Sequence, residues 1–252
     1  MGGAAKEKAR YVYGIVPASP RKRRRAKGIH GKPLRTVTSG SLGALVTAVP
    51  GTELRAGRDE ILAHSHVLEK ALASGPVLPM RFGVIMPDEA AVRDGLLDPH
   101  RAALEAQFEA LGDKVELNVK GFYDEDSVLS EIVAEDREVA ELRAVVNGQP
   151  ADATHFERIR LGELVAADLA AKREADERRI LDSLVGYATE MESGKLAHEH
   201  MVVNSSFLVE RSKVAAFDKA LERIASEQHP RIGFRLTGPL PPHSFVELGV
   251  EA

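Results

Sequence analysis

The stretch LTGPLPPHSFVEL, residues 236–248, sets a glycine and three prolines between two apolar segments near the C-terminus. Proline fixes φ and removes a backbone donor, whereas Gly238 can adopt conformations that other residues avoid. We therefore expect a stiff corner that leads residues 243–250 into a final strand, with Phe245 held in one register. The corner's main role is then architectural, and its exposed face is a secondary candidate for partner contact. Its prolines are Pro239, Pro241 and Pro242.

The segments before this corner predict a small sheet crossed by helices. A long charged helix is expected over residues 154–189, with two apolar stripes separated by a polar middle. A strand at 199–211, a helix at 212–229 and a strand at 231–238 are expected to follow it. This order, closed by the final strand, favours a ferredoxin-like fold with modifications.

The N-terminal half predicts a mixed arrangement of its own. β-branched, alternating segments indicate strands at 10–18, 33–40, 42–50, 76–86 and 114–123. Helical spacing of apolar residues indicates helices at 58–73, from Pro87 onward and at 101–111, followed by a helical stretch at 125–146. The helix at 58–73 carries the apolar residues Ile61, Leu62, Val67, Leu68, Ala71 and Leu72.

We therefore assign the chain to the α+β class, with two domains. Residues 1–123 are expected to form an N-terminal mixed α+β domain with a basic loop at 19–33. Residues 124–153 are expected to be a helical connection, and residues 154–252 a C-terminal modified ferredoxin-like domain with the long helix. A chain of 252 residues with 44% hydrophobic content can build both cores.

Composition excludes several kinds of site. The sequence has no cysteine, so it has no disulfide, thiol nucleophile or Cys-ligated zinc site. No apolar run approaches the ~20 residues that span a bilayer, and no apolar core follows the first basic residues as it would in a signal peptide. We expect a cytoplasmic protein with no membrane partner.

Charge is distributed unevenly along the chain. Residues 1–35 have a net charge of +10, whereas the remainder has −14. A solvated loop is the simplest interpretation of the basic run, and contact with an acidic protein surface or with nucleic-acid phosphates is an alternative. The absence of Trp and an aromatic content of 5% argue against nucleic acid. The run consists of Arg21, Lys22, Arg23, Arg24 and Arg25.

The histidines do not form a recognisable metal site. His64 and His66 are two residues apart on an expected helix, so they point to different sides. His198 and His200 could share a strand face, but two ligands make a poor site and no third is evident. Metal binding at this pair is the weakest of the functional hypotheses.

No common catalytic signature is present. The phosphate-binding, dinucleotide-binding, nucleophile-elbow and metalloprotease motifs are all missing from the sequence. His243 and Ser244 are adjacent, which would point their side chains to opposite faces of a strand and disfavours a nucleophile–base pair. We therefore expect no enzymatic activity, no catalytic residue and no cofactor.

The segment VLPMRFGVI, residues 77–85, is the other unusual stretch. Arg81 stands between apolar residues, so burial would require a carboxylate or backbone carbonyl as its partner. Arg81 could organise the domain or form part of an interaction groove. The sequence leaves both interpretations open.

Several segments, taken in order, resemble the gas vesicle protein family GvpL/GvpF. They are YVYGIV, VLPMRFGVI, VELNVKGFYD, NSSFLVER and LTGPLPPHSFVEL, and the resemblance runs from about residue 10 to residue 248. The insert SPRKRRRAKGIHGKP departs from it, so the resemblance assigns this insert no role. The most specific parts are LPMRFG and the terminal motif, which contain Arg81, Phe82, Gly83, Gly238, Pro239, Pro241, Pro242 and Phe245.

The resemblance implies a non-enzymatic accessory or minor structural protein of gas vesicles, with a two-domain α+β architecture. The implied partners are the shell protein GvpA and other Gvp accessory proteins, during nucleation or assembly of the vesicle. The alternative hypothesis is a module that binds nucleic acid or an acidic surface through residues 21–27.

Overall fold

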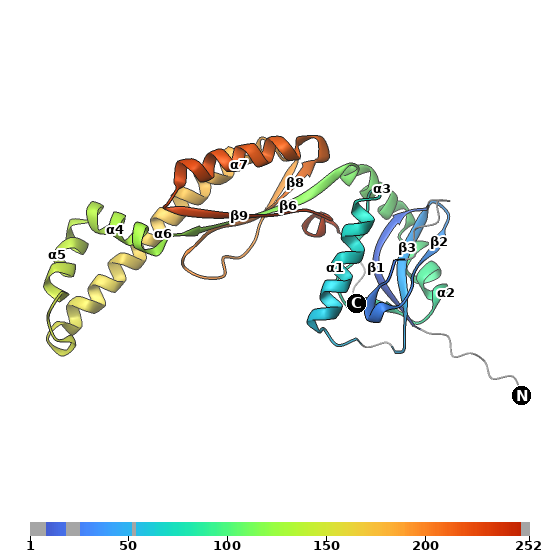
Figure 1. The fold of residues 1–252 in the computed structure, drawn as a ribbon, viewed down its shortest axis with the longest axis horizontal. Coiled ribbons are helices and arrows are strands. Elements are labelled where there is room, and N and C mark those ends of the chain that lie inside the picture. The colour runs from blue at the N-terminus through green and yellow to red at the C-terminus, as the bar shows by residue number, and fades with distance from the viewer. Residues whose placement is uncertain (1–8, 19–25, 52–53, 248–252) are drawn as a thin grey trace, which may run out of the picture. The chain divides into compact units, whose positions relative to one another are not determined.

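The computed structural model describes residues 9–18, 26–51 and 54–247 (Figure 1). These residues divide into two compact units. Unit 1 contains the described residues up to Glu116 together with those from Pro239 onward, and unit 2 is Leu117–Gly238. Among the described residues, no helix combines the length and the apolar character needed to cross a membrane.

These units differ from the domains expected from the sequence. The helices within residues 124–153 belong to unit 2 with the long helix, and the residues after Gly238 return to unit 1. The return has a local cause: Glu116 accepts two hydrogen bonds from Ser244, one from the backbone N–H at 2.8 Å and one from Oγ at 2.9 Å. As a statement about independently folding domains, the sequence-based division stays a prediction.

Unit 1 is built on an antiparallel sheet. Strands β1 (Ala9–Pro17), β2 (Leu34–Ser39) and β3 (Leu42–Val49) lie in the order β2-β3-β1, and β1 also pairs with the short strands β4 (Leu78–Pro79) and β5 (Ile85–Met86). The expected turn between β2 and β3 is confirmed, with Gly40 at φ 57° in the left-handed region that favours glycine.

Helix α1 (Arg58–Leu72) packs its apolar face inward in unit 1. Its buried residues follow the i, i+3, i+4, i+7 spacing of one helix face. They are His64, Val67, Leu68, Ala71 and Leu72. Ile61 and Leu62, expected on the same apolar face, are instead 47% and 56% exposed.

The rest of unit 1 consists of short helical segments. The Asp88 carboxylate caps helix α2 (Glu89–Ala91) by accepting from the Ala91 N–H at 2.7 Å, which confirms the expected helix start. A π-helical segment, Val92–Leu97, follows and buries Val92, Leu96 and Leu97. Helix α3 (Arg101–Leu111) then ends at Gly112 as expected.

Unit 2 contains a second sheet. Its strands are β6 (Lys114–Tyr123), β7 (Glu190–Ser193), β8 (Met201–Glu210) and β9 (Ile232–Leu240), in the order β7-β8-β6-β9. Strand β7 was not expected from the sequence, because all four of its residues are exposed and it has no apolar alternation. The helices of the unit are α4 (Glu125–Glu135), α5 (Arg137–Val146), α6 (His155–Val185) and α7 (Val214–Gln228).

Asp136 interrupts the helical stretch expected at 125–146. Its carboxylate caps α5 by accepting from the Val139 N–H at 3.0 Å, so the chain starts a second helix at this point. Most of the two apolar stripes expected on the long helix packs against the core of unit 2, whereas Val185 of the second stripe is 49% exposed. The packed residues are Leu161, Leu164, Val165, Leu169, Ile180, Leu181 and Leu184. Lys172, near the middle of α6, pairs with Glu131 and Glu135 of α4.

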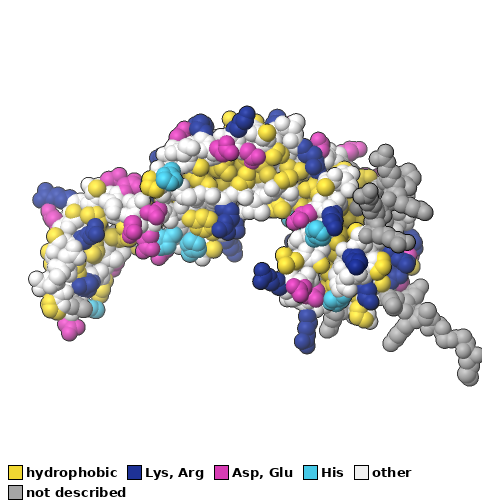
Figure 2. All heavy atoms as spheres, in the orientation of Figure 1, with side chains coloured by type: hydrophobic (Ala, Val, Ile, Leu, Met, Phe, Trp, Pro, Cys, Tyr) yellow, Lys and Arg dark blue, Asp and Glu magenta, His cyan; other side chains and the backbone are white. Residues whose placement is uncertain are grey.

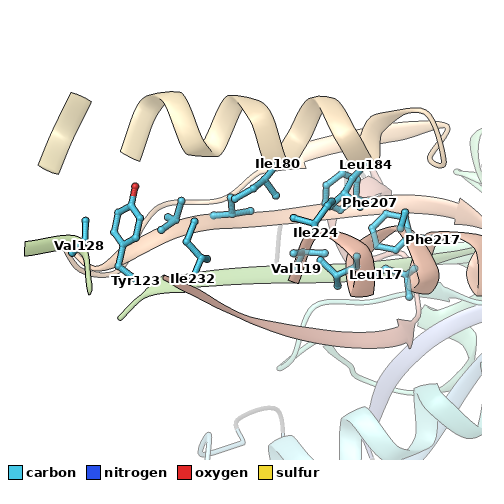
Figure 3. Close-up of a cluster of buried hydrophobic side chains, with 14 of the residues drawn as sticks. Leu117, Val119, Tyr123, Val128, Ile180, Leu184, Phe207, Phe217, Ile224 and Ile232 are labelled. Atoms are coloured by element: carbon cyan, nitrogen blue, oxygen red, sulfur yellow. The ribbon is translucent and has the colours of Figure 1, made fainter. Parts of the chain in front are cut away.

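The core of unit 2 lies between its sheet and its helices (Figure 3). Ile180 and Leu184 point from α6 toward the strands, and Phe207 of β8 meets Phe217 of α7 edge to face at a centroid distance of 5.1 Å. The β6 residues that contribute are Leu117, Val119 and Tyr123. One face of the sheet is therefore apolar and covered by helices.

A buried charge network joins three elements at one end of this core. Asp176 of α6 is buried, accepts a hydrogen bond from the Tyr123 hydroxyl at 2.6 Å, and pairs with Arg231 at 2.6 Å. Arg231 also pairs with Glu131 of α4 and lies over the Tyr123 ring, 5.3 Å from its centroid. Burial and the Asp176 carboxylate raise the pKa of Tyr123 above its usual value, so the phenol stays a donor.

The expected final strand at 243–250 is wrong for its described part. Strand β9 continues through Gly238 and Pro239 to Leu240, and residues His243–Phe245 then form a 3₁₀ turn. The turn forms because the His243 N–H donates to the Pro241 carbonyl at 2.7 Å and the Ser244 N–H donates to the Glu116 carboxylate. Residues 248–250 lie outside the described residues.

Replacing Asp176 by Ala should lower the free energy of unfolding by about 3 kcal/mol, because Arg231 and the Tyr123 hydroxyl lose a buried partner. Urea denaturation measures the change. The control is Glu174→Ala, which breaks only the exposed pair with Arg178 and should cost under about 0.5 kcal/mol. Equal losses in the two variants would contradict the network's role.

Candidate functional site

The LPMRFG segment forms an arch beside β1. Gly14 pairs with Pro79 and Tyr11 pairs with Ile85, so two residues of β1 stand opposite five residues, 80–84, of the other segment. The base of this arch is closed by two backbone hydrogen bonds of 2.9 Å, from Met80 N–H to the Tyr13 carbonyl and from Val12 N–H to the Val84 carbonyl. The three extra residues must project from the sheet.

Glycine allows the arch to turn back. Gly83 has φ 99°, a conformation that residues with a side chain rarely adopt. Its N–H donates to the Tyr11 hydroxyl at 3.2 Å. Phe82 is half-buried against Tyr11, whereas Arg81 is exposed. Among the described residues Arg81 has no hydrogen bond or ion pair, so it is available to a partner.

The Tyr11 hydroxyl connects the arch to α1. Its oxygen lies 2.8 Å from Nδ1 of His64 and also accepts from the Gly83 N–H, and a neutral imidazole with its proton on Nε2 accepts the hydroxyl proton at Nδ1. Phe82 completes the cluster, with its ring centroid 5.7 Å from that of His64. The neutral imidazole is therefore the form that this cluster fits.

Burial lowers the pKa of His64 to about 4, and the neighbouring His243 adds to the shift, while a hydrogen bond to the Met80 backbone opposes it. His64 belongs to no metal site: among the residues that the structure describes, no group of three His, Asp or Glu is placed to hold an ion. It is a structural anchor that sequence reasoning missed. The signal was its place at the start of the buried stripe of α1.

Tyr13 holds a second loop from the same face of β1. Its hydroxyl accepts from the Ile29 N–H at 2.8 Å and donates to Thr47 Oγ1 at 3.0 Å. A Cβ on Gly28 would lie 2.1 Å from the Tyr13 hydroxyl oxygen, so only glycine fits there. Tyr11 and Tyr13 are both fully buried and pack edge to face.

The proline corner is a buried support. Pro241 and Pro242 are buried and Phe245 is half-buried, whereas Gly238 at φ 147° and Pro239 are exposed. The Ser244 hydroxyl donates to Glu116 Oε1 at 2.9 Å. These contacts fit the architectural role expected for the corner, and its secondary role in partner contact stays a prediction.

The remaining candidate residues are the histidine pair His198 and His200 and the basic run. The His198 ring stacks on Phe122, and its centroid is 6.3 Å from that of His200. The basic run, residues 21–25, lies outside the described residues, so its proposed contacts stay a prediction.

Helix α1 carries an exposed apolar pair, Ile61 and Leu62, which the sequence analysis placed on its apolar face. Ile61 and Leu62 stand beside a shallow hollow of about 420 Å³, lined by Leu62, Ala63, Ser65, His66 and Glu69. We call Ile61 and Leu62 the α1 patch. Leu62 is out of phase with the buried stripe that starts at His64, and this is the signal that could have identified it.

Comparison with known proteins gives a consistent result. A family model described as gas vesicle synthesis protein GvpL/GvpF matches residues 9–247. The chain is 38% identical to gas vesicle protein F of Streptomyces sp. (strain CB03234) over 240 residues, which cover 94% of this chain and 99% of the relative. It is 25% identical to gas vesicle protein F of Dolichospermum flosaquae, with coverage of 94% and 97%.

The fold also resembles a solved structure. The crystal structure of gas vesicle protein GvpF from Anabaena sp. PCC7120 superposes with a TM-score of 0.84 at 24% identity, covering 97% of this chain and 100% of the other. This likeness confirms the α+β class.

Acid should destabilise the folded chain through His64. Below pH 6.5 the unfolded chain binds a proton at this imidazole, whereas the folded chain binds it only near pH 4. Stability contributed by neutral His64 is therefore lost as the pH falls from about 6.5 to about 4, by ~3 kcal/mol. Urea denaturation at pH values across this window measures the loss.

The matched variants are His64→Gln and His66→Gln. The first should remove most of this pH dependence, and the second should keep it, because His66 is exposed on the same helix. The assignment fails if both variants retain the wild-type slope.

Proposed function

The chain belongs to the GvpL/GvpF family of gas vesicle proteins, and we propose that it is an accessory or minor structural protein that binds the shell protein GvpA and assists vesicle nucleation and assembly. Family membership confirms the resemblance carried by LPMRFG and the terminal motif. The association with gas vesicles rests on the family, whereas binding of GvpA and help in nucleation are the parts we propose.

The α1 patch is the observation that carries this proposal. Ile61 and Leu62 are adjacent, about half exposed, and lie on a helix that is otherwise charged on its outer face. Exposed apolar side chains that cluster in this way are typical of protein contact sites. A small hydrophobic shell subunit needs such a surface to cover its own apolar side chains before it joins the wall.

The arch supplies a second candidate contact in unit 1. Phe82 and Gly83 are held by Tyr11 and His64, so the backbone that carries Arg81 is fixed while its guanidinium stays exposed. A fixed backbone lowers the entropy cost of contact with a partner. We propose Arg81 as a polar contact that accompanies the apolar one.

The fold suits a binding role. The element order of unit 2, strand, helices, two strands, helix and strand, supports its description as a modified ferredoxin-like domain. The same proposal makes the chain non-enzymatic and cytoplasmic, with other Gvp accessory proteins as further partners. Such a protein acts through its surfaces alone.

Capture of GvpA by the tagged full chain after co-expression, at low and at high salt, tests the proposal. Wild-type chain should capture GvpA in a salt-resistant manner, because the contact is apolar. Replacing both Ile61 and Leu62 by Asp should lower capture at least about tenfold, since burial of each side chain contributes ~1.5 kcal/mol or more.

Val185→Asp is the matched control. Val185 is 49% exposed on α6, close to the 47% of Ile61, but it lies in unit 2. Its variant should capture GvpA like the wild type. Equal capture by the α1 double variant would remove the patch from the contact, and no capture by the wild type would refute GvpA binding.

A further inference from the structure

The sheet of unit 2 has a second face, opposite its helix-covered core, and part of this face is buried by described residues such as Leu208. Successive side chains of a strand point to opposite faces, and Leu117 and Val119 of β6 enter the helix-covered core, so Asn118 and Lys120 point to the other side. In β9, Ile232 is in the core with Phe234 and Leu236 packed against it. Arg235, which is exposed, therefore shares this second face with the half-buried Lys120.

Two contacts fix the register of β6 against β9. The Asp124 N–H donates to the Arg231 carbonyl at 2.9 Å, and a Cβ on Gly121 would lie 3.3 Å from the Phe234 ring. As β6 advances from 121 to 124, β9 runs back from 234 to 231, so the strands are antiparallel. This register sets Lys120 directly opposite Arg235.

Lys120 and Arg235 are like charges without an acidic partner. Among the described residues neither makes an ion pair, and like charges directly opposite in a sheet destabilise it. Glu116 of β6 also points to this face, but it is buried, bonds to Ser244 and stands four residues, about 13 Å, from Lys120 along the strand. Glu190 and Glu192 lie on β7 at the other edge. Strand β7 is two strand spacings, about 9 Å, from Lys120 on β6 and three, about 14 Å, from Arg235 on β9. The basic pair is therefore suited to an external carboxylate.

Strand β9 can also pair through its backbone. It is the last strand on its side of the sheet, and the Arg231 carbonyl points toward β6. Backbone groups alternate in direction along a strand, so those of Ile232, Phe234 and Leu236 point away from β6, where the described chain offers no strand partner. An added strand would place its own side chains beside Arg235.

We propose that the β9 edge binds an extended acidic segment of a partner protein, which adds a strand to the sheet and sets a carboxylate against Lys120 and Arg235. Figure 2 shows dark blue basic and cyan histidine side chains on the side of unit 2 away from α7. This surface belongs to unit 2, and the inference is independent of the α1 patch.

The rival occupants fit less well. If two copies of the chain paired through their β9 edges, one basic strand would face another, because the β9 sequence IGFRLTGPL contains Arg235 and no acidic residue. Nucleic acid would meet the same positive charge, but Phe122 on this face is already stacked on His198, so its ring is engaged. Charge complementarity therefore favours an acidic peptide.

Fluorescence anisotropy of the full chain with a labelled peptide of alternating Val and Glu tests the proposal. The peptide should bind, and a matched Val–Lys peptide should not. Arg235→Glu and Lys120→Glu should each weaken binding at least about fivefold, because each replaces attraction by repulsion. The double variant should instead bind the Val–Lys peptide. Alternate N-methylation of the Val–Glu peptide should abolish binding, since it removes the backbone donors.

Lys219→Glu is the control, because Lys219 is exposed on α7 and its reversal changes the net charge equally. It should leave binding unchanged.

The proposal is overturned if the Val–Glu peptide does not bind, if the N-methylated peptide binds as well, or if Arg235→Glu has no effect. Binding of a single-stranded RNA oligonucleotide in its place, or self-association lost in Arg235→Glu by sedimentation velocity, would also overturn it and identify the other occupant.

Discussion

A buried tyrosine hydroxyl must find a hydrogen-bond partner, and three of the chain's four tyrosines meet this constraint by joining segments far apart in sequence. Tyr11 joins β1 to the arch and to α1, and Tyr13 joins β1 to the loop around Ile29 and to β3. Tyr123 joins β6 to α6. Each unit thus has a polar anchor inside an apolar core.

These anchors explain why the candidate contact residues lie where they do. The arch can project Arg81 because Gly83 and Phe82 are held from below by Tyr11 and His64. The charge network around Asp176 likewise fixes the start of β9, since Arg231 precedes that strand. In both units a rigid interior supports a surface that has unpaired groups, which is the usual arrangement of a binding protein.

The sequence was sufficient for most elements with strong periodicity. Strands β1, β2, β3 and β6 and helices α1, α3 and α6 were predicted within a few residues, because apolar spacing dominates in them. Prediction from the sequence failed where individual polar contacts determine the local structure. The expected strand after the proline corner is a turn because Glu116 takes the Ser244 N–H, and the strand at 76–86 is divided by the arch.

The candidate sites were harder to predict than the fold. Arg81 was singled out as unusual, but its exposure depends on the mismatch of two residues against five beside β1, which is a tertiary property. The opposition of Lys120 and Arg235 depends on a register between segments more than a hundred positions apart. The exposure of Leu62 follows from its position on the helical wheel of α1 and could have been predicted. The exposure of Arg81 and the opposition of Lys120 and Arg235 could not.

Amide hydrogen exchange in Tyr11→Phe and Tyr13→Phe tests most directly whether the two hydroxyls anchor separate segments of unit 1. The Gly83 amide should lose protection in Tyr11→Phe and keep it in Tyr13→Phe, and the Ile29 amide should show the reverse. Tyr187→Phe should change neither. Unchanged protection at Gly83 in Tyr11→Phe, or an equal loss at both amides in both variants, would contradict the account.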